Sequence, residues 1–378
     1  MRIAEVKAHV LEAELARPFS SSFSTFRTRT ACLVEITCED GTTGWGECLG
    51  PAQPNAAVVA ACRPLLLGRD ALAIERIWME LYNQFRDQGQ KGLAVTALSG
   101  IDIALWDLRG KRFEAPVHML MGGALRREVR AYATGTFRRD AGRRIDYIVE
   151  EVLGYVREGF SSVKLKIGFN VEEDAAVIRA CREAVGREIG LMIDANHGYD
   201  AIEAIRLGRL VADCDIGWFE EPVVPEDLDS YLEVRRGQPI PVAGGETWYT
   251  RFNFREVLAR RAVDIVQPDV CGAGGLSEAK KIADMASAFG VRCVPHVWGT
   301  GVAIAAALQL LAVLPDSPPR HEPREVLLEF DRTEQPFRQA ILTEPIEHSA
   351  GIVRVPEGPG LGITIDPTTL KRFRSEAP

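Results

Sequence analysis

Ionisable side chains recur at the ends of short apolar runs in the second half of the chain. They begin with Lys164 and Lys166 and continue with Asp194, Glu220, Glu246, Asp269, His296 and Glu329. From Lys166 onward each lies 23 to 33 residues after the one before it, which is about the length of one strand and one helix. If the runs are parallel strands of a barrel, their carboxyl ends meet at one rim. We therefore expect these groups to converge on a single pocket.

Three successive carboxylates in this series, Asp194, Glu220 and Glu246, point to a metal site. Converging anions repel one another unless a cation lies between them, and an all-oxygen ligand set favours Mg²⁺ over zinc. One acidic residue at a strand end is more often a rim charge or a helix cap, but three in register favour ligation. Because Glu221 adjoins Glu220, only one of the two can point to the barrel axis.

The remaining groups suggest proton transfer next to a carboxylate. Lys164 and Lys166 precede the carboxylates in the chain, and Asp269 and His296 follow them. Removing an α-proton requires that the resulting enediolate be held by strong positive charge, which a metal ion and a lysine can supply. We expect Lys164 to lower the pKa of Lys166, which makes Lys166 a base, and Asp269 to orient His296. Alone, the lysines could be solvated and the histidine could be an ordinary core residue.

Several further positions are assigned less directly. Glu329, if protonated, could donate a hydrogen bond to the enediolate, and Glu322 and Glu325 compete for that role. The expected substrate contacts are Asn196, His197 and Trp298, although an exposed loop position is the default for His197. The polar segments 16–29 and 47–55 are expected to be irregular loops that cover the pocket.

The elements that must position these residues fall into three parts. Residues 1–125 form an α+β capping domain, in which strands up to about residue 50, paired across the turn at Asp40-Gly41, are followed by helices. Residues 126–339 alternate eight apolar runs with amphipathic stretches, which predicts a parallel βα barrel. An open doubly wound sheet is the alternative, but its usual GxGxxG turn is missing. The segment 340–378 is expected to pack back on the capping domain.

Composition excludes several classes of partner. The chain has 378 residues, with 45 Lys and Arg against 53 Asp and Glu, so its net charge of -8 argues against nucleic acid and acidic membranes. No apolar run is long enough to span a membrane. The eight cysteines are scattered singly, as expected for reduced thiols in the cytoplasm.

The motifs VKLK, MIDAN, WFEEP, GGET, QPD and VPH resemble the mandelate racemase subgroup of the enolase superfamily. The resemblance extends over essentially the whole chain and includes GIDIALWDLRGK, MLMGG and GPGLG. It implies a modified TIM barrel, (β/α)7β, with an α+β capping domain, Mg²⁺ held by Asp194, Glu220 and Glu246, and a homo-oligomer. The motif position also favours Glu220 over Glu221.

The function implied is Mg²⁺-dependent removal of the proton α to a sugar-acid carboxylate, followed by β-elimination. The favoured reaction is the ring-opening cycloisomerisation of a hexaric-acid 1,4-lactone to a 3-deoxy-2-keto acid. A linear sugar-acid dehydratase or a racemase of the same subgroup is the first alternative. A Schiff-base aldolase using Lys166, or a barrel that only binds sugar acids, are the alternatives from other classes.

Overall fold

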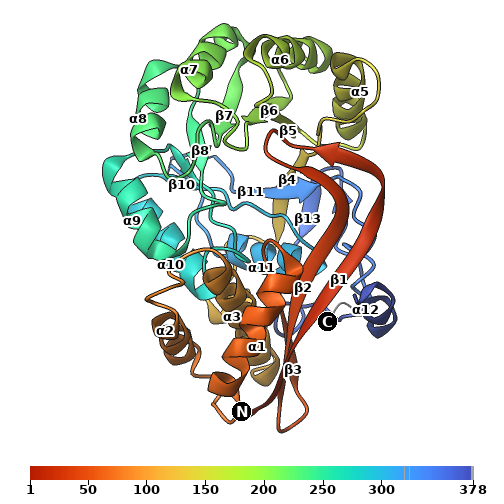
Figure 1. Cartoon of the computed structure of the whole chain (residues 1–378), viewed down its shortest axis with the longest axis vertical. Helices are drawn as coiled ribbons and strands as arrows, with labels where there is room; N and C mark the ends of the chain where they lie inside the picture. The colour runs from red at the N-terminus through yellow and green to blue at the C-terminus, as the bar shows by residue number, and fades with distance from the viewer. Residues whose placement is uncertain (319, 323, 376–378) are drawn as a thin grey trace.

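The computed structural model describes residues 1–318, 320–322 and 324–375, which form two layered parts and a returning C-terminal segment (Figure 1). The capping region begins with three antiparallel strands, β1 (Ile3–Ser20), β2 (Thr25–Cys38) and β3 (Thr43–Cys48), in the order β1-β2-β3. The turn at Gly41, whose φ is +83°, joins β2 to β3 as the sequence predicted. Segment 16–29, expected to be an irregular loop, is instead mostly strand, and only residues 21–24 form its turn.

Helices complete the capping region and pack on its sheet. They are α1 (Ala52–Leu66), α2 (Ile74–Gln84), α3 (Leu93–Arg112) and the single turn α4 (Val117–Leu120). Helix α3 is buried along most of its length. It packs against β3 where Gly46 of the strand meets Gly100 of the helix. A Cβ atom on Gly46 would lie 2.0 Å from the carbonyl oxygen of Gly100, so only glycine permits this close approach.

In the described residues the barrel alternates eight strands with seven helices, as predicted. Its strands are β4 (Glu128–Thr134), β5 (Ser162–Lys166), β6 (Gly190–Asp194), β7 (Ile216–Glu220), β8 (Val242–Gly244), β9 (Ile265–Val266), β10 (Arg292–Cys293) and β11 (Leu327–Asp331). Between them lie α5 (Arg144–Arg157), α6 (Val171–Val185), α7 (Ala201–Leu210), α8 (Leu228–Gly237), α9 (Thr250–Arg260), α10 (Gly275–Ala288) and α11 (Gly301–Leu311). A short 3₁₀ turn, η1 (Ala212–Cys214), follows α7.

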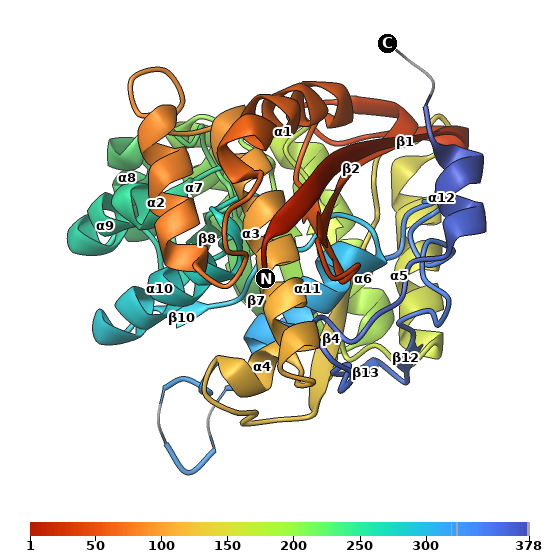
Figure 2. The ribbon, with the colours of Figure 1, turned by 90° about the horizontal axis from the view of Figure 1, so that it is seen from below.

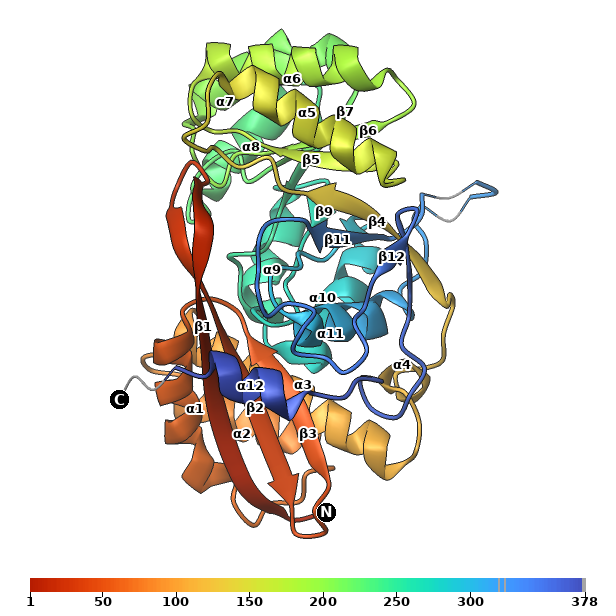
Figure 3. The same ribbon diagram turned by 90° about the vertical axis from the view of Figure 1, so that its right-hand side faces the viewer.

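The barrel strands pair in parallel in the order β10-β9-β8-β7-β6-β5-β4, and β11 pairs with β4. Among the described residues no ladder joins β10 to β11, so backbone pairing does not close the ring. The helices line the outside of this array, and the capping region covers one end of it (Figures 1 and 3). The fold is therefore the capped (β/α)7β arrangement that the sequence predicted.

The C-terminal segment contacts both parts. Strand β13 (Ile352–Arg354) pairs with β12 (His348–Ser349) and also with β4, so it extends the barrel sheet. Helix α12 (Pro367–Phe373) lies beside β1 (Figures 2 and 3), and the Ser375 amide donates to the carbonyl of Val10. The segment thus ties the barrel to the capping region.

All eight cysteines lie in the described part of the chain and carry free thiols. No helix of the described residues is long and apolar enough to cross a membrane.

Candidate active site

The strand register brings the predicted residues to one end of the barrel. In the parallel ladder Lys166 lies beside Asp194, and Asp194 lies beside Glu220. Parallel strands that end in register place their last side chains side by side. Lys164 also lies on β5, and the other four residues come from the remaining strands: Glu246 and Asp269 follow β8 and β9, His296 follows β10, and Glu329 lies within β11. The structure therefore brings together residues that are far apart in the sequence.

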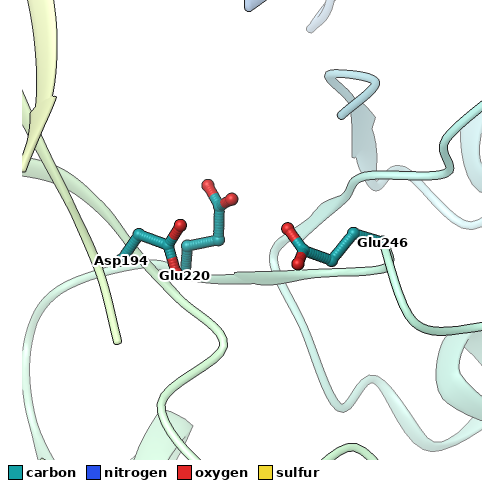
Figure 4. A group of neighbouring side chains, drawn as sticks. All are labelled: Asp194, Glu220 and Glu246. Carbon is teal, nitrogen blue, oxygen red and sulfur yellow. The ribbon is translucent and has the colours of Figure 1, made fainter. Parts of the chain in front are cut away.

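The carboxylates of Asp194, Glu220 and Glu246 converge (Figure 4). One oxygen of each lies within 4.8 Å of the others. Burial raises the pKa of both glutamates to about 7, whereas for Asp194 the nearby Lys166 and Lys164 outweigh burial and hold the pKa at about 2. One oxygen of Glu246 is buried and accepts no hydrogen bond, and His296 Nε2 is the charged group beside it, at 3.2 Å. Three buried carboxylates that converge in this way fit a divalent cation.

Glu221 points away from this cluster, as the motif position suggested. Its Oε1 accepts a hydrogen bond from Thr247 Oγ1 at 2.9 Å, and its Oε2 lies 3.0 Å from His197 Nδ1. The adjacent Glu220 turns into the barrel, where Trp218 Nε1 and Gln267 Nε2 donate to its Oε2 at 2.8 and 2.6 Å. These contacts fix one oxygen of Glu220.

The two lysines lie inside the barrel and are paired with carboxylates. Lys164 Nζ is 2.5 Å from Glu220 Oε1, and Lys166 Nζ is 2.5 Å from Asp194 Oδ2 and 3.0 Å from Asn196 Oδ1. Burial has the largest single effect and lowers the pKa of Lys166, but the combined attraction of Asp194, Glu246 and Glu220 outweighs burial and the repulsion of Lys164, so its pKa is raised. Lys164 does lower the pKa of Lys166 as expected, but the surrounding carboxylates outweigh this effect, so the expectation of a net lowered pKa is wrong.

Glu329 also differs from its expected state. Its Oε1 lies 2.7 Å from Lys164 Nζ, and its Oε2 accepts a hydrogen bond from the amide of Val297 at 3.2 Å. Burial raises the pKa of this carboxyl, but Lys164 and His296 outweigh burial and lower it. Glu329 is therefore ionised, and the expected protonated donor is wrong, because Lys164 stands next to it. The competing residues Glu322 and Glu325 are exposed on the surface.

His296 and Asp269 form the predicted pair opposite the lysines. His296 Nδ1 lies 2.7 Å from Asp269 Oδ2, and His296 Nε2 lies 3.2 Å from Glu246 Oε2. The amide of Cys271 donates to Asp269 Oδ1 at 2.6 Å, which fixes the other oxygen of this carboxylate. Burial lowers the pKa of His296, but Glu246 and Glu329 outweigh it and raise the pKa to about 10.

A cavity of about 390 Å³ lies between the barrel end and the capping region. The barrel contributes Lys166, Asn196, Glu246, Thr247, Tyr249, His296 and Trp298, and the capping region contributes Ser21, Phe26, Leu49, Gly50, Pro51, Gly92, Leu93 and Thr96, with Phe137 from the loop after β4. Of the three expected substrate contacts, Asn196 and Trp298 line the cavity. His197 lies outside its wall, edge-on against Phe23.

Sequence reasoning missed the residues that hold Lys166 in place. Thr136 Oγ1 accepts a hydrogen bond from the Lys166 amide at 3.0 Å, and Arg144 Nη2 donates to the Lys166 carbonyl at 2.9 Å. Arg144 is in turn paired with the buried Asp174. No local pattern marks these contacts. Trp218, however, stands two residues before Glu220 on β7, and the period of a strand is the signal that predicts that the two face the same way.

Comparisons with known proteins show which family the chain belongs to. Residues 4–122 match the family model "Mandelate racemase / muconate lactonizing enzyme, N-terminal domain", and residues 147–369 match "Enolase C-terminal domain-like". The chain is 57% identical to D-galactarolactone cycloisomerase of Agrobacterium fabrum over 100% of both chains. It is 36% identical to arabinonate dehydratase of Saccharolobus solfataricus over 91% of this chain and 90% of that protein.

Solved structures show the same arrangement over the full chain. The 3,6-anhydro-D-galactonate cycloisomerase from Zobellia galactanivorans superposes with a TM-score of 0.91 at 39% identity, covering 100% of both chains. A racemase from Streptomyces coelicolor with bound magnesium superposes with a TM-score of 0.87 at 29% identity, covering 99% of this chain and 100% of that one. The chain therefore belongs to the mandelate racemase and muconate lactonizing enzyme family of the enolase superfamily.

Proposed function

We propose that this chain is a Mg²⁺-dependent isomerase that opens the ring of D-galactaro-1,4-lactone by β-elimination. The observation that carries the choice of substrate is the 57% identity to D-galactarolactone cycloisomerase over the entire chain. The site supports it independently, because the two candidate bases, Lys166 and His296, line one cavity together with the metal-ligand candidate Glu246.

Asp194, Glu220 and Glu246 are the residues that hold the metal in this proposal. A bound Mg²⁺ supplies positive charge that stabilises the enediolate formed when the α-proton leaves. Lys164 adds a second positive charge, since it is buried within the same group of carboxylates.

Lys166 and His296 are the two candidate bases, and both line the cavity. Asp269 holds His296 Nδ1, so Nε2 is the nitrogen that faces the substrate. Lys166 Nζ faces the same space from β5, held by Asn196 and Asp194. Which of the two takes the proton depends on the configuration of the α-carbon.

The proposed reaction conserves all atoms of the lactone. A base takes the α-proton, and the electron pair of that C–H bond forms a carbon–carbon double bond. The bond from the β-carbon to the ring oxygen breaks, and its electron pair leaves with the ring carboxylate, which stays attached to the molecule. The resulting enol ketonises to a 3-deoxy-2-keto-hexarate. Because the leaving group remains attached, the reaction is an isomerisation.

The test is to incubate the purified protein and Mg²⁺ with D-galactaro-1,4-lactone and, in parallel, with linear aldonic and aldaric acids. We expect the lactone to be turned over, as monitored by NMR in deuterated water. We expect EDTA to abolish this activity. A linear sugar-acid dehydratase is the second candidate, since the arabinonate dehydratase is 36% identical. Turnover of linear acids alone would establish that candidate instead.

Two variants separate catalysis from simple binding. Lys166→Ala and His296→Asn are each expected to lose turnover while the carboxylate cluster still binds Mg²⁺. A barrel that only binds sugar acids would have no turnover to lose. An aldolase acting through Lys166 would keep its activity in EDTA, and borohydride would trap its substrate adduct.

A further inference from the structure

Two buried carboxylates of the capping region reach across to the barrel. Glu47 lies on β3 and Asp102 lies on α3, and they are 3% and 1% exposed. Neither lines the cavity. Each contacts the first turn of a barrel helix, and these two helices are α11 and α10, which follow His296 and Asp269 in the chain.

Glu47 holds the beginning of α11. Its carboxylate accepts hydrogen bonds from the amide of Thr300 at 2.9 Å, the hydroxyl of Thr300 at 2.6 Å and the amide of Ala303 at 3.0 Å. A Cβ atom on Gly299 would lie 2.7 Å from the Glu47 carboxylate, so glycine is needed at this position. His296 stands four residues before Thr300.

Asp102 holds the beginning of α10 in the same way. Its carboxylate accepts from the amide of Ser277 at 2.9 Å and from the hydroxyl of Ser277 at 2.6 Å. A Cβ atom on Gly275 would lie 2.3 Å from Asp102 Oδ2, so glycine is again found where the carboxylate approaches. The N-cap of this helix, Gly274, has no side chain of its own to offer.

These contacts satisfy donors that the barrel helices leave free. The first amides of a helix lack partners within it, and a carboxylate at that end is favoured by the helix dipole. Here the carboxylates come from another part of the fold, across 175 and 253 residues of sequence. A third link joins the same loops, because the amide of Leu49 donates to the carbonyl of Cys271, just after Asp269.

We infer that Glu47 and Asp102 are positioning residues through which the capping region sets the geometry of the His296–Asp269 pair. Asp269 and His296 lie on the loops that lead into α10 and α11. Because the capping region holds the first turns of both helices, its docking fixes the positions of the two side chains. The inference rests on the proposed function, in which His296 transfers a proton. Misplacing a catalytic group by about 1 Å can lower a rate by roughly 10²-fold.

The experiment compares Glu47→Ala and Asp102→Ala with the conservative Glu47→Gln and Asp102→Asn. With the lactone and Mg²⁺, we expect each alanine variant to lower kcat by about 10²-fold with little change in KM. The amide variants keep an acceptor for the helix amides and should restore most of kcat. Mg²⁺ affinity by calorimetry should not change, since the ligands lie on β6, β7 and the loop after β8.

Asp107→Ala is the matched control. Asp107 lies on α3 like Asp102 and is fully buried, but it accepts from the amides of Trp45 and Leu361 and pairs with Lys111, and in the described part of the chain it makes no hydrogen bond or ion pair with α10 or α11. We expect this variant to lose thermal stability while keeping kcat. If it lowers kcat as much as Asp102→Ala, or if the Glu47 and Asp102 variants change KM or Mg²⁺ affinity instead of kcat, the inference is overturned.

Hydrogen exchange measured by mass spectrometry makes the test independent of the substrate. In Glu47→Ala we expect faster exchange in residues 294–303, and in Asp102→Ala in residues 267–277, with residues 162–170 around the lysines unchanged in both. If the wild-type chain does not turn over the lactone, the proposed function fails while this readout still applies. Unchanged exchange in the loops after β9 and β10 would overturn the positioning inference itself.

Discussion

Lys164 and Glu329 form a fully buried ion pair, with 2.7 Å between Nζ and Oε1. The lysine also contacts Glu220, so one ammonium group balances two carboxylates inside the barrel. Buried carboxylates without such a partner are costly, and they become protonated instead. The pair explains why Glu329 is ionised, and it joins β11 to the lysine strand β5 on the far side of β4.

Glu329→Gln is expected to destabilise the chain. Removing one partner of a buried pair costs roughly 3–5 kcal/mol, and the loss here should fall below that range because Glu220 still faces Lys164. Urea unfolding of the metal-free chain measures the loss. Glu325→Gln, which removes an exposed partner of Arg130, is the control and should change stability little. Equal losses in both variants would contradict the importance of the buried pair.

Mg²⁺ affinity is expected to rise with pH up to about 7 and then level off. Burial raises the pKa of the Glu220 and Glu246 carboxyls to about 7, and both must lose their protons to bind a cation. Below that pH, protons therefore compete with the metal. Titration calorimetry in buffers of different ionisation enthalpy should show protons released on binding at pH 6 and few released at pH 8. Affinity independent of pH over this range would contradict the assignment of these two ligands.

Asp269→Asn is expected to lower kcat by about 10²–10⁴-fold while leaving Mg²⁺ affinity unchanged. The asparagine cannot stabilise a charged His296 or fix its Nδ1 as the aspartate does across 2.7 Å. Steady-state kinetics with the lactone measures the change. Asp284→Asn, which alters an exposed partner of Lys280 on the outside of the barrel, should keep full activity. A loss of Mg²⁺ binding in Asp269→Asn would instead place this residue among the metal ligands.

The sequence allowed the order of the elements and the site residues at strand ends to be predicted, because both follow from periodicity. Strands β4 to β11 each match an apolar run, and Asp194 and Glu220 lie side by side because their strands end in register. The charge states of Lys166 and Glu329 could not be predicted. They depend on which oppositely charged atom is nearest, and chain order does not fix distances of that kind.

The contacts between the capping region and the barrel could not be predicted from the sequence either. Glu47 falls in a segment that composition marked as a covering loop, but it is the penultimate residue of β3 and lies buried against α11. The expectation of an irregular loop over segment 16–29 is wrong for a related reason. Its serines and arginines suggested a loop, whereas pairing with a neighbouring strand places most of it in a long hairpin. Tertiary pairing overrides local composition in both places.

Asp102 makes the stability of the fold depend on pH, and because this side chain is buried, its contribution decreases as the pH rises. Burial raises the pKa of this carboxyl from 3.8 to about 7, and the hydrogen bonds from Ser277 only partly offset that rise. Between these values the folded chain holds a proton that the unfolded chain releases. The contribution of Asp102 to stability is therefore complete at low pH and is lost as the pH rises toward 7 and above.

Asp102→Asn should remove this dependence, since the amide stays neutral at every pH. Relative to the wild-type chain, the variant should gain stability between pH 5 and pH 8, by at most roughly 3 kcal/mol, as measured by urea unfolding. Asp146→Asn is the control. Arg143 lowers the pKa of this exposed carboxyl, so Asp146 is ionised at both pH values. The stability of Asp146→Asn relative to the wild-type chain should therefore be the same at pH 5 and pH 8. If the free energy of unfolding changes with pH in the same way in the wild-type chain and in Asp102→Asn, the prediction is contradicted. Asp102 would then be ionised at pH 5 in the folded chain, and the first turn of α10 would bind a carboxylate over the whole pH range.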